Sequence, residues 1–477
     1  MRLQAKEKLA PTWTEGIFLL VCGGILLVQL FLPGFIGIAD NNDFPKVTGP
    51  FCVIGVDHSA DIFVYFQPDY VHDSRFCYRP GIPSSEIPLA WLAFQAAWLF
   101  QHSGHIDIRW MGAIHALIFL SFFYALLRLL RPLKAAARLV LSVAALWIFT
   151  DVSIVSYCNT FFMDAAGIFF GLLAAVLAVY LIVEVRVVTL ALFGLAAIGF
   201  VTSKGPNAVV GVVPLAFVTP LIWRGTTKTI RDLASWISAA MLVGMLWTFL
   251  APPNWYQGQP RFSLVFFRIA KQSATPAKDL HELGLGDADL RYVGMTAYSP
   301  DSPMFTSWSD VFCARTSYSR VLAFYLHHPA TMLSFLWYDL SVSSRERRQY
   351  TLSNFQRSAG RPAGALTQRF AWWSNLRAWL FAHWPAHMLI WYAFVFVGMP
   401  LLMLRNASPY RRAIAWTVIG ISVMAAGEFG IASLSDACET GRHLIMFHVF
   451  TDLAMFLSLA FAAAPENSDY RRSSRAR

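Results

Sequence analysis

Long apolar runs without charged residues recur along this chain, and they constrain its fold more than any other feature. Short connections rich in Lys and Arg separate them. Only 14% of the residues are charged and 56% are hydrophobic, whereas about 25% are charged in an average soluble domain. So few charges cannot cover a soluble surface, and runs near 20 residues are long enough to cross a bilayer as helices. The sequence therefore predicts an all-α polytopic membrane protein.

The runs predict ten transmembrane helices, which we orient by the rule that Lys and Arg gather in cytoplasmic connections. Basic residues near both chain ends place both termini in the cytoplasm. The chain then divides into an N-terminal membrane module (1–251) with a first outer loop (39–108), a large extracytoplasmic loop (252–384) and a C-terminal membrane module with a basic tail (385–477). The predicted spans are 14–38, 109–128, 139–156, 165–184, 187–202, 208–223, 233–251, 385–404, 413–434 and 444–464.

The net charge of +10 has an explanation in this architecture. Positive charge marks cytoplasmic loops and meets anionic lipid, so membrane lipid is the expected contact and nucleic acid is not. The first apolar run is also too long for the core of a cleaved signal peptide.

Two further apolar segments are not counted as spans. Residues 87–100 are too few to cross a bilayer and predict an interfacial or re-entrant helix. Residues 321–338 are about long enough, but a crossing there would move the basic connection at 405–412 to the outside. The run from His327 to Pro329 also interrupts this segment. We therefore expect it to be an amphipathic or partly buried helix within the outer loop.

Polar residues gather at the outer ends of the predicted spans, and the first such cluster runs from Asp40 to Lys46. One interpretation is a helix stop, because Asn and Asp bond their own backbone. The other is a catalytic carboxylate held at the membrane surface. The same loop contains Cys52 and Cys77, which can form a disulfide if the loop faces an oxidising compartment.

Three later clusters carry similar alternatives. Asp164 either favours the dipole of the helix that starts there or orients an acceptor or a divalent ion. Lys204, which precedes Gly-Pro-Asn, either anchors a span or contacts a phosphate. Arg442 and His443 lie where the helix dipole disfavours a cation. A bound phosphate, or pairing of Arg442 with Glu439, would explain their position.

Three features carry a family resemblance. They are the acidic motif Ile38-Ala39-Asp40-Asn41-Asn42-Asp43-Phe44, the turn Tyr157-Cys158-Asn159-Thr160-Phe161-Phe162-Met163-Asp164, and the large outer loop before the last spans. Together they resemble the GT-C class of polytopic glycosyltransferases over most of the chain. The resemblance implies an enzyme that takes a sugar from a polyprenyl phosphate on the extracytoplasmic face, in a bacterial inner membrane. It also implies a catalytic carboxylate at Asp40 or Asp43 and a second acid at Asp164.

The chain departs from the oligosaccharyl-transferring members of that class. Its nearest string to their Trp-Trp-Asp motif is Trp372-Trp373-Ser374, which lacks the acid. N-glycan transfer is therefore not expected.

Moving a sugar from a lipid phosphate to a glycan or lipid acceptor needs a base for the acceptor proton and cations for the leaving phosphate. One carboxylate suffices as the base of an inverting displacement, so Asp40 and Asp43 are both candidates. No DxD-type ligand set is present, and a divalent metal ion is left open. The candidate substrate-binding residues are Asn42, Asn159, Asp164, Lys204, Arg442 and His443.

Two other functions remain open: a transporter or flippase of lipid-linked sugar, and a glycan polymerase or ligase. A transporter should place ionisable groups near the middle of the membrane. Glu428 and Asp452 are the best candidates for such groups.

Overall fold

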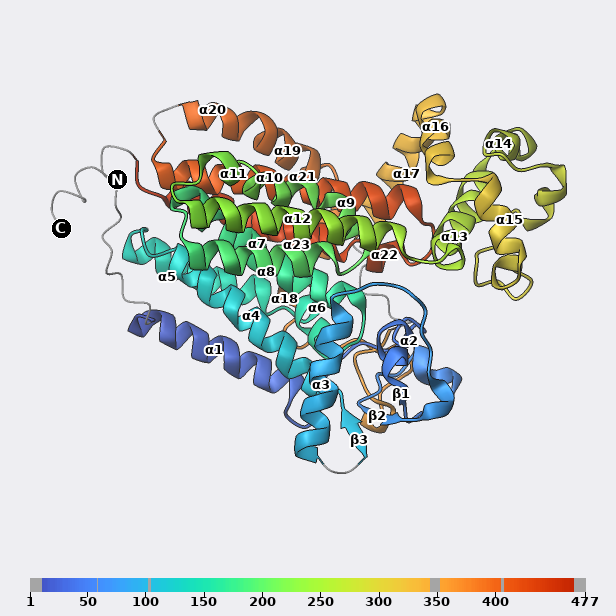
Figure 1. Cartoon of the computed structure of the whole chain (residues 1–477), viewed down its shortest axis with the longest axis horizontal. Helices are drawn as coiled ribbons and strands as arrows, with labels where there is room; N and C mark the ends of the chain where they lie inside the picture. The colour runs from blue at the N-terminus through green and yellow to red at the C-terminus, as the bar shows by residue number, and fades with distance from the viewer. Residues whose placement is uncertain (1–10, 58, 102–103, 344–351, 405–406, 467–477) are drawn as a thin grey trace.

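The computed structural model describes residues 11–57, 59–101, 104–343, 352–404 and 407–466. Its long helices run along one direction, and α1 begins and α23 ends at the same end of the bundle (Figure 1). Within the described residues, eight helices are long and apolar enough to cross a membrane, and a ninth is added if one bent pair counts as a span. This confirms the prediction of an all-α polytopic membrane protein.

The first half of the bundle has helices at each predicted span from 14–38 to 233–251, although three of these spans differ from the prediction in length or shape. A capping box between Thr12 and Glu15 starts α1, and the side chain of Thr227 caps α12. The helices are α1 (Trp13–Leu30), α4 (Arg109–Leu129), α5 (Ala135–Phe149), α6 (Val152–Val155), α7 (Met163–Val183), α8 (Val187–Val201), α9 (Gly205–Val210), α10 (Val212–Val218), α11 (Leu221–Arg224) and α12 (Lys228–Leu250).

Three predicted spans need correction. The first ends at Leu30 instead of residue 38, because the chain turns after Pro33 at Gly34, whose φ is +83°. The predicted span 139–156 is bent by 52° between α5 and the segment Val152–Cys158. The predicted span 187–202 is α8, which has only 15 residues. Among the described residues, the ten predicted spans therefore correspond to eight full candidate spans, one bent span and one short apolar helix.

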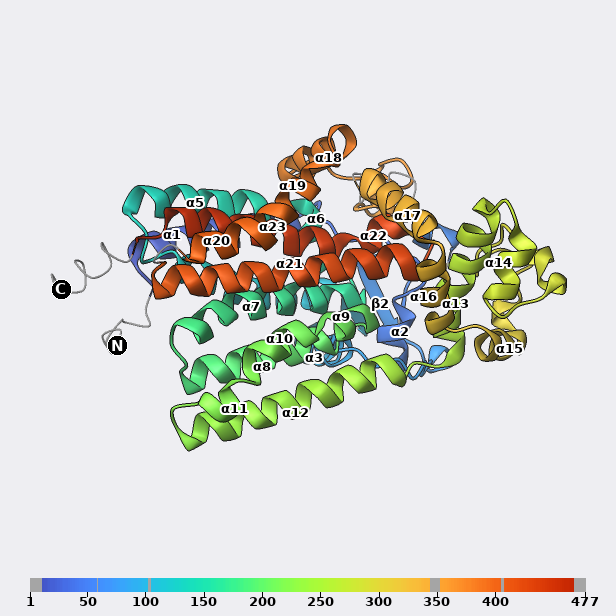
Figure 2. The ribbon, with the colours of Figure 1, turned by 90° about the horizontal axis from the view of Figure 1, so that it is seen from above.

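The second half of the bundle contains α19 (His387–Ala393), a π-helical turn (Phe394–Gly398), α20 (Met399–Leu404), α21 (Pro409–Ser435), α22 (Thr440–His443) and α23 (Ile445–Ala463). The centre lies at α7 and α23, since 72% and 83% of their most apolar windows are buried. α21 packs against both, and α12 lies at one flank of the bundle (Figure 2).

The first loop is more elaborate than the sequence predicts. It contains α2 (Pro45–Thr48), α3 (Glu86–Gln101) and a three-stranded antiparallel sheet of β1 (Val53–Gly55), β2 (Asp69–His72) and β3 (His105–Asp107). The predicted short helix at 87–100 is α3. Cys52 and Cys77 form a disulfide, which confirms that pairing.

The large loop begins with an outer domain that has its own hydrophobic core, centred on Phe262, Phe266 and Phe312. Its helices are α13 (Asn254–Phe262), a π-helix (Ser263–Ala270), α14 (Pro276–Glu282), α15 (Trp308–Arg315), α16 (Tyr318–His327) and α17 (Pro329–Val342). The apolar segment 321–338 is thus split between α16 and α17 at His328, and neither helix is long enough to cross a membrane.

The chain then returns to the bundle through α18 (Trp372–His383). Arg377 of α18 forms a buried ion pair with Asp452 of α23, and Asp151 accepts the backbone N–H of Ser374 at 2.9 Å. These contacts fix the end of the large loop on the central helices.

Candidate active site

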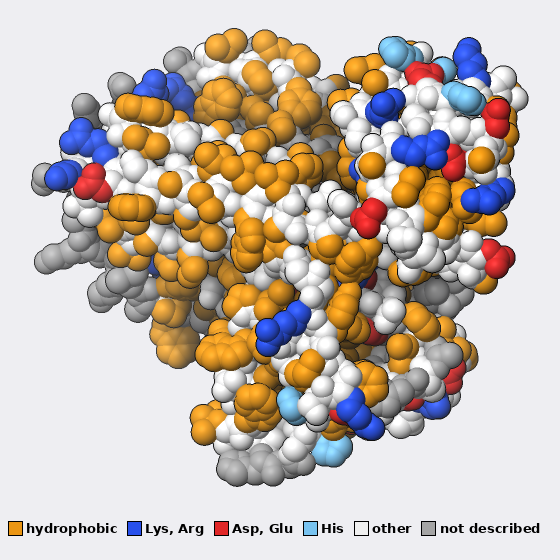
Figure 3. All heavy atoms as spheres, turned by 45° about the vertical axis from the view of Figure 1, so that its right-hand side comes forward, with side chains coloured by type: hydrophobic (Ala, Val, Ile, Leu, Met, Phe, Trp, Pro, Cys, Tyr) orange, Lys and Arg blue, Asp and Glu red, His pale blue; other side chains and the backbone are white. Residues whose placement is uncertain are grey.

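The polar clusters identified in the sequence converge at the end of the bundle that carries the outer domain. The first loop, the start of α7, the turn before α9 and the segment 436–443 meet there, and their ion pairs connect them. The space-filling view shows the outer domain and the first loop as two lobes with a hollow between them (Figure 3).

Arg442 is the hub of this cluster. Its guanidinium lies 2.9 Å from Glu439 through Nε, 3.2 Å from Asp164 through Nη1 and 3.2 Å from Asp43 through Nη2. The side chain is only 8% exposed and stacks over the ring of Phe162, 4.8 Å from its centroid. Because its guanidinium pairs with all three carboxylates, Arg442 links its own segment to the first loop and to the start of α7.

Lys204 and Lys46 place two ammonium groups in the cluster, and each retains N–H donors for a further partner. Lys204 Nζ lies 3.1 and 3.3 Å from the two carboxylate oxygens of Asp164. Lys46 pairs with Asp43 and lies over the ring of Tyr256, 4.9 Å from its centroid. An ammonium group has three N–H donors, so each lysine can bind a further anion while it keeps its carboxylate partner.

Asp40 has a different environment from the other acids. Its Oδ1 accepts the backbone N–H groups of Asp43 and Phe44 at 2.9 and 3.1 Å. No side chain among the described residues donates a hydrogen bond to Asp40, although the backbone N–H of Asn42 also interacts with its carboxylate. Burial raises the pKa of Asp40 to about 7, and the charge of Asp43 adds to that rise, although the backbone N–H groups oppose it. Asp40 is therefore suited to exchange a proton near neutral pH.

Asp43 is suited to remain charged. Burial acts to raise its pKa, but the neighbouring charges of Lys46 and Arg442 outweigh burial and hold the pKa well below its usual range. Two carboxylates three residues apart thus have pKa values shifted in opposite directions. The sequence left open whether Asp40 or Asp43 is the base. The opposite pKa shifts make Asp40 the candidate base and Asp43 a partner of the cations.

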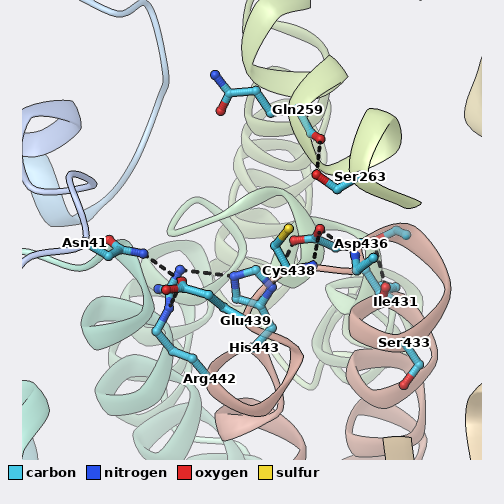
Figure 4. A network of polar contacts seen from close by, with 12 residues as sticks. Asn41, Gln259, Ser263, Ile431, Ser433, Asp436, Cys438, Glu439, Arg442 and His443 are labelled. Atoms are coloured by element: carbon cyan, nitrogen blue, oxygen red, sulfur yellow. Dashed lines mark hydrogen bonds and ion pairs between the residues drawn. The ribbon is translucent and has the colours of Figure 1, made fainter. Parts of the chain in front are cut away.

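His443 lies between Asp436 and Arg442 (Figure 4). Its Nδ1 is 3.3 Å from Asp436 Oδ2, and its Nε2 is 3.1 Å from Nη2 of Arg442. A neutral ring that donates from Nδ1 can accept from Arg442 at Nε2, so His443 helps to orient the guanidinium. Burial acts to raise the pKa of Asp436, but hydrogen bonds from His443 and two backbone N–H groups lower it.

The backbone before Asp40 is held by a distant part of the chain. The N–H of Ala39 donates to the carbonyl of Ser353 at 3.0 Å, and Asn354 Nδ2 donates to the carbonyl of Gly37 at 2.8 Å. A Cβ at Gly37 would lie 2.1 Å from the ring of Phe66. Only a glycine fits there, so this position of Asp40 depends on both Gly37 and the large loop.

Two of the candidate substrate-binding residues, Asn159 and Asn42, have structural contacts or positions of their own. Asn159 is fully buried, and its amide donates to the carbonyls of Leu30 and Ile36 at 3.1 and 2.8 Å. It therefore supports the end of α1, and the expectation that it binds substrate stays a prediction. Asn42 is exposed with a φ of 74°, so it forms the turn between Asp40 and Asp43.

The two candidate transporter acids differ from each other. Asp452 is occupied by its ion pair with Arg377. Glu428 of α21 is 3% exposed, and its Oε1 has no hydrogen-bond partner among the described residues. It lies near enough to Lys204 and Asp164 for an electrostatic interaction.

No group of three or more His, Cys, Asp or Glu side chains within the described ranges could hold a metal ion. Asp164, a possible ligand in the sequence, is paired with Lys204 and Arg442. Asp43, Asp164 and Glu439 thus have cationic side chains as their partners, whereas Asp40 is bonded by backbone N–H groups.

Sequence reasoning assigned no role to Lys46 or Tyr256. Tyr256 comes from α13 of the outer domain, and its nearest charged neighbours include Lys204 and Asp43. Burial raises its pKa to about 12, so the phenol remains a hydrogen-bond donor. Lys46 had a visible signal, as a cation three residues after Asp43. Nothing local in the sequence identifies Tyr256.

A family model described as the YfdI N-terminal transmembrane domain matches residues 4–475. No curated protein and no solved structure matches this chain. The match covers nearly the whole sequence and agrees with the bundle of apolar helices. The chain therefore belongs to the family of the YfdI N-terminal transmembrane domain.

Proposed function

We propose that this protein is a membrane glycosyltransferase that moves a sugar from a polyprenyl-phosphate donor to a glycan or lipid acceptor. Asp40 is the base, and the reaction takes place on the extracytoplasmic face of a bacterial inner membrane, with both termini in the cytoplasm. The observation that best supports this function is that Asp40 bonds the backbone of Asp43, whose own carboxylate pairs with Lys46 and Arg442.

The roles follow from the charges. The acceptor hydroxyl attacks the sugar carbon, its proton passes to Oδ2 of Asp40, and the bond from the sugar to the phosphate oxygen breaks. The phosphate leaves as an anion, which Lys46 and Lys204 stabilise with their remaining N–H donors. The phosphate needs no proton to leave, so a single base suffices and the displacement inverts the sugar carbon.

A lipid-linked donor would reach the lysines from the membrane. Lys204 directly precedes α9, at the start of a candidate span, so a prenyl chain among the lipid tails would have its phosphate near Lys204.

Transport of lipid-linked sugar is the second candidate, and Glu428 favours it. A buried carboxyl group without a hydrogen-bond partner is a frequent sign of an ion or proton pathway in a membrane protein. Glycan polymerisation or ligation would use the same cations but would not require Asp40.

A paired substitution tests the proposal. We expect Asp40→Asn to lower the transfer rate by roughly 10²–10⁴-fold, the usual contribution of a general base, at unchanged protein level. The assay uses purified protein in vesicles that contain lipid-linked sugars extracted from membranes, and it measures sugar transferred to the acceptor. Asp43→Asn is the companion variant. Transfer at the parental rate by both variants would contradict the proposal, and translocation without transfer would favour the transporter.

A further inference from the structure

Three side chains between the outer domain and the first loop have no part in the proposed reaction. They are Tyr298, Gln259 and Asn41. Each has one chemical group that makes no hydrogen bond to a described residue. These groups are the ring of Tyr298, the amide nitrogen of Gln259 and the amide oxygen of Asn41.

Tyr298 presents an open aromatic ring. It is 60% exposed, whereas Tyr292 of the same segment is 7% exposed and packs in the domain core. The hydroxyl of Tyr298 donates to Oε1 of Gln259 at 3.4 Å. It also interacts electrostatically with Asp43 and Glu439. The hydroxyl therefore points toward the acids of the site, while the ring contacts Phe305 at a centroid distance of 6.5 Å and is otherwise largely exposed.

Gln259 presents an unused donor. The residue is 4% exposed, and its backbone carbonyl accepts from Ser263 at 3.1 Å. Its Nε2 makes no hydrogen bond to a described residue. In Figure 4 its amide points away from Ser263, toward the side on which Asn41 lies.

Asn41 presents an unused acceptor. Its Nδ2 donates to Glu439 at 2.7 Å, but its Oδ1 is buried and has no hydrogen-bond partner among the described residues. A buried polar atom without a partner destabilises the folded protein. A ligand hydroxyl at this position would remove that destabilisation.

These groups indicate the chemical class of a ligand. An aromatic face packs on the C–H face of a pyranose ring, while an amide donor and an amide acceptor bind its hydroxyl groups. None of these three side chains carries a charge, so they fit an uncharged ligand. We propose that Tyr298, Gln259 and Asn41 form a subsite for an uncharged sugar ring of the acceptor.

This inference rests on the proposed function and deepens it. The acceptor is a glycan and not a lipid, because its binding groups lie on the outer domain and the first loop and not on the membrane-spanning helices. Asn41 directly follows Asp40, so a hydroxyl of the bound ring lies close to the base.

Binding without turnover tests the subsite. The full-length protein carries Asp40→Asn, so the result does not depend on whether Asp40 is the base. The probes are the methyl glycosides of glucose, galactose, mannose and N-acetylglucosamine, detected by saturation-transfer NMR. We expect at least one glycoside to bind, and Tyr298→Ala to weaken its binding about tenfold or more, equivalent to about 1.4 kcal/mol.

Tyr338→Ala is the matched control, because Tyr338 of α17 is also 60% exposed but belongs to a different surface. It should bind the glycoside as the parent does. Tyr298→Phe should retain most of the binding, since it keeps the ring. The subsite is wrong if no glycoside binds, or if Tyr298→Ala and Tyr338→Ala have equal effects.

Discussion

At the scale of single residues, Asp40 and Asp43 show how environment divides the roles of similar side chains. The pKa of Asp40 is raised to about 7 and that of Asp43 is lowered. The folded state therefore holds a proton on Asp40 between about pH 4 and 7 that the unfolded chain lacks, so this residue weakens folding as the pH rises through that range. Asp43 contributes the opposite effect, which is lost as the pH falls below about 4.

Arg442→Lys should destabilise the protein although it keeps the charge. A lysine cannot reproduce the fork that contacts Glu439, Asp164 and Asp43, and loss of one such charged hydrogen bond costs roughly 1.5–3 kcal/mol. Thermal unfolding in detergent measures the change. Arg412→Lys, at an exposed position on α21, is the control and should leave the midpoint unchanged. An unchanged midpoint for Arg442→Lys would contradict its role as a hub.

At the scale of elements, the site depends on a pairing between the first loop and the large loop. Gly37→Ala tests this dependence, because its new Cβ would meet Phe66 at 2.1 Å and the carbonyl of Asn159 at 2.6 Å. We expect the rate of sugar transfer to fall at least tenfold, because a displaced Asp40 would take the acceptor proton less efficiently. The substitution itself removes no reacting group. Gly24→Ala is the control, because a Cβ there meets nothing within 4 Å. Normal transfer by Gly37→Ala would show that the pairing does not position Asp40.

The same element shows what could and could not be predicted from the sequence. Apolar runs and basic connections predicted the helices and the four polar clusters, because both signals are local. The hydrogen bond from Asn41 to Glu439 joins residues 398 positions apart, and no spacing rule reaches that far. The contacts of Asn159 were not predicted for the same reason, since its partners Leu30 and Ile36 are more than 120 positions away.

At the scale of the whole molecule, we expect the outer domain and α18 to lie on the same, extracytoplasmic side of the membrane. The test replaces Cys313 and Cys438 by Ser and adds a single cysteine at Asp301, Asn375 or Thr226, all of which are exposed. A membrane-impermeant maleimide on intact cells should label Asp301→Cys and Asn375→Cys but not Thr226→Cys. Label at only one of positions 301 and 375 would mean that segment 321–338 crosses the membrane.

The central claim is that Asp40 takes the acceptor proton, and the pH dependence of the transfer rate tests it most directly. A base with a pKa of about 7 predicts a rate that rises about tenfold per pH unit below that value and levels off above it. Thermal unfolding at each pH checks that the protein stays folded. A rate that is equal at about pH 5 and pH 8 in the folded protein would contradict the claim.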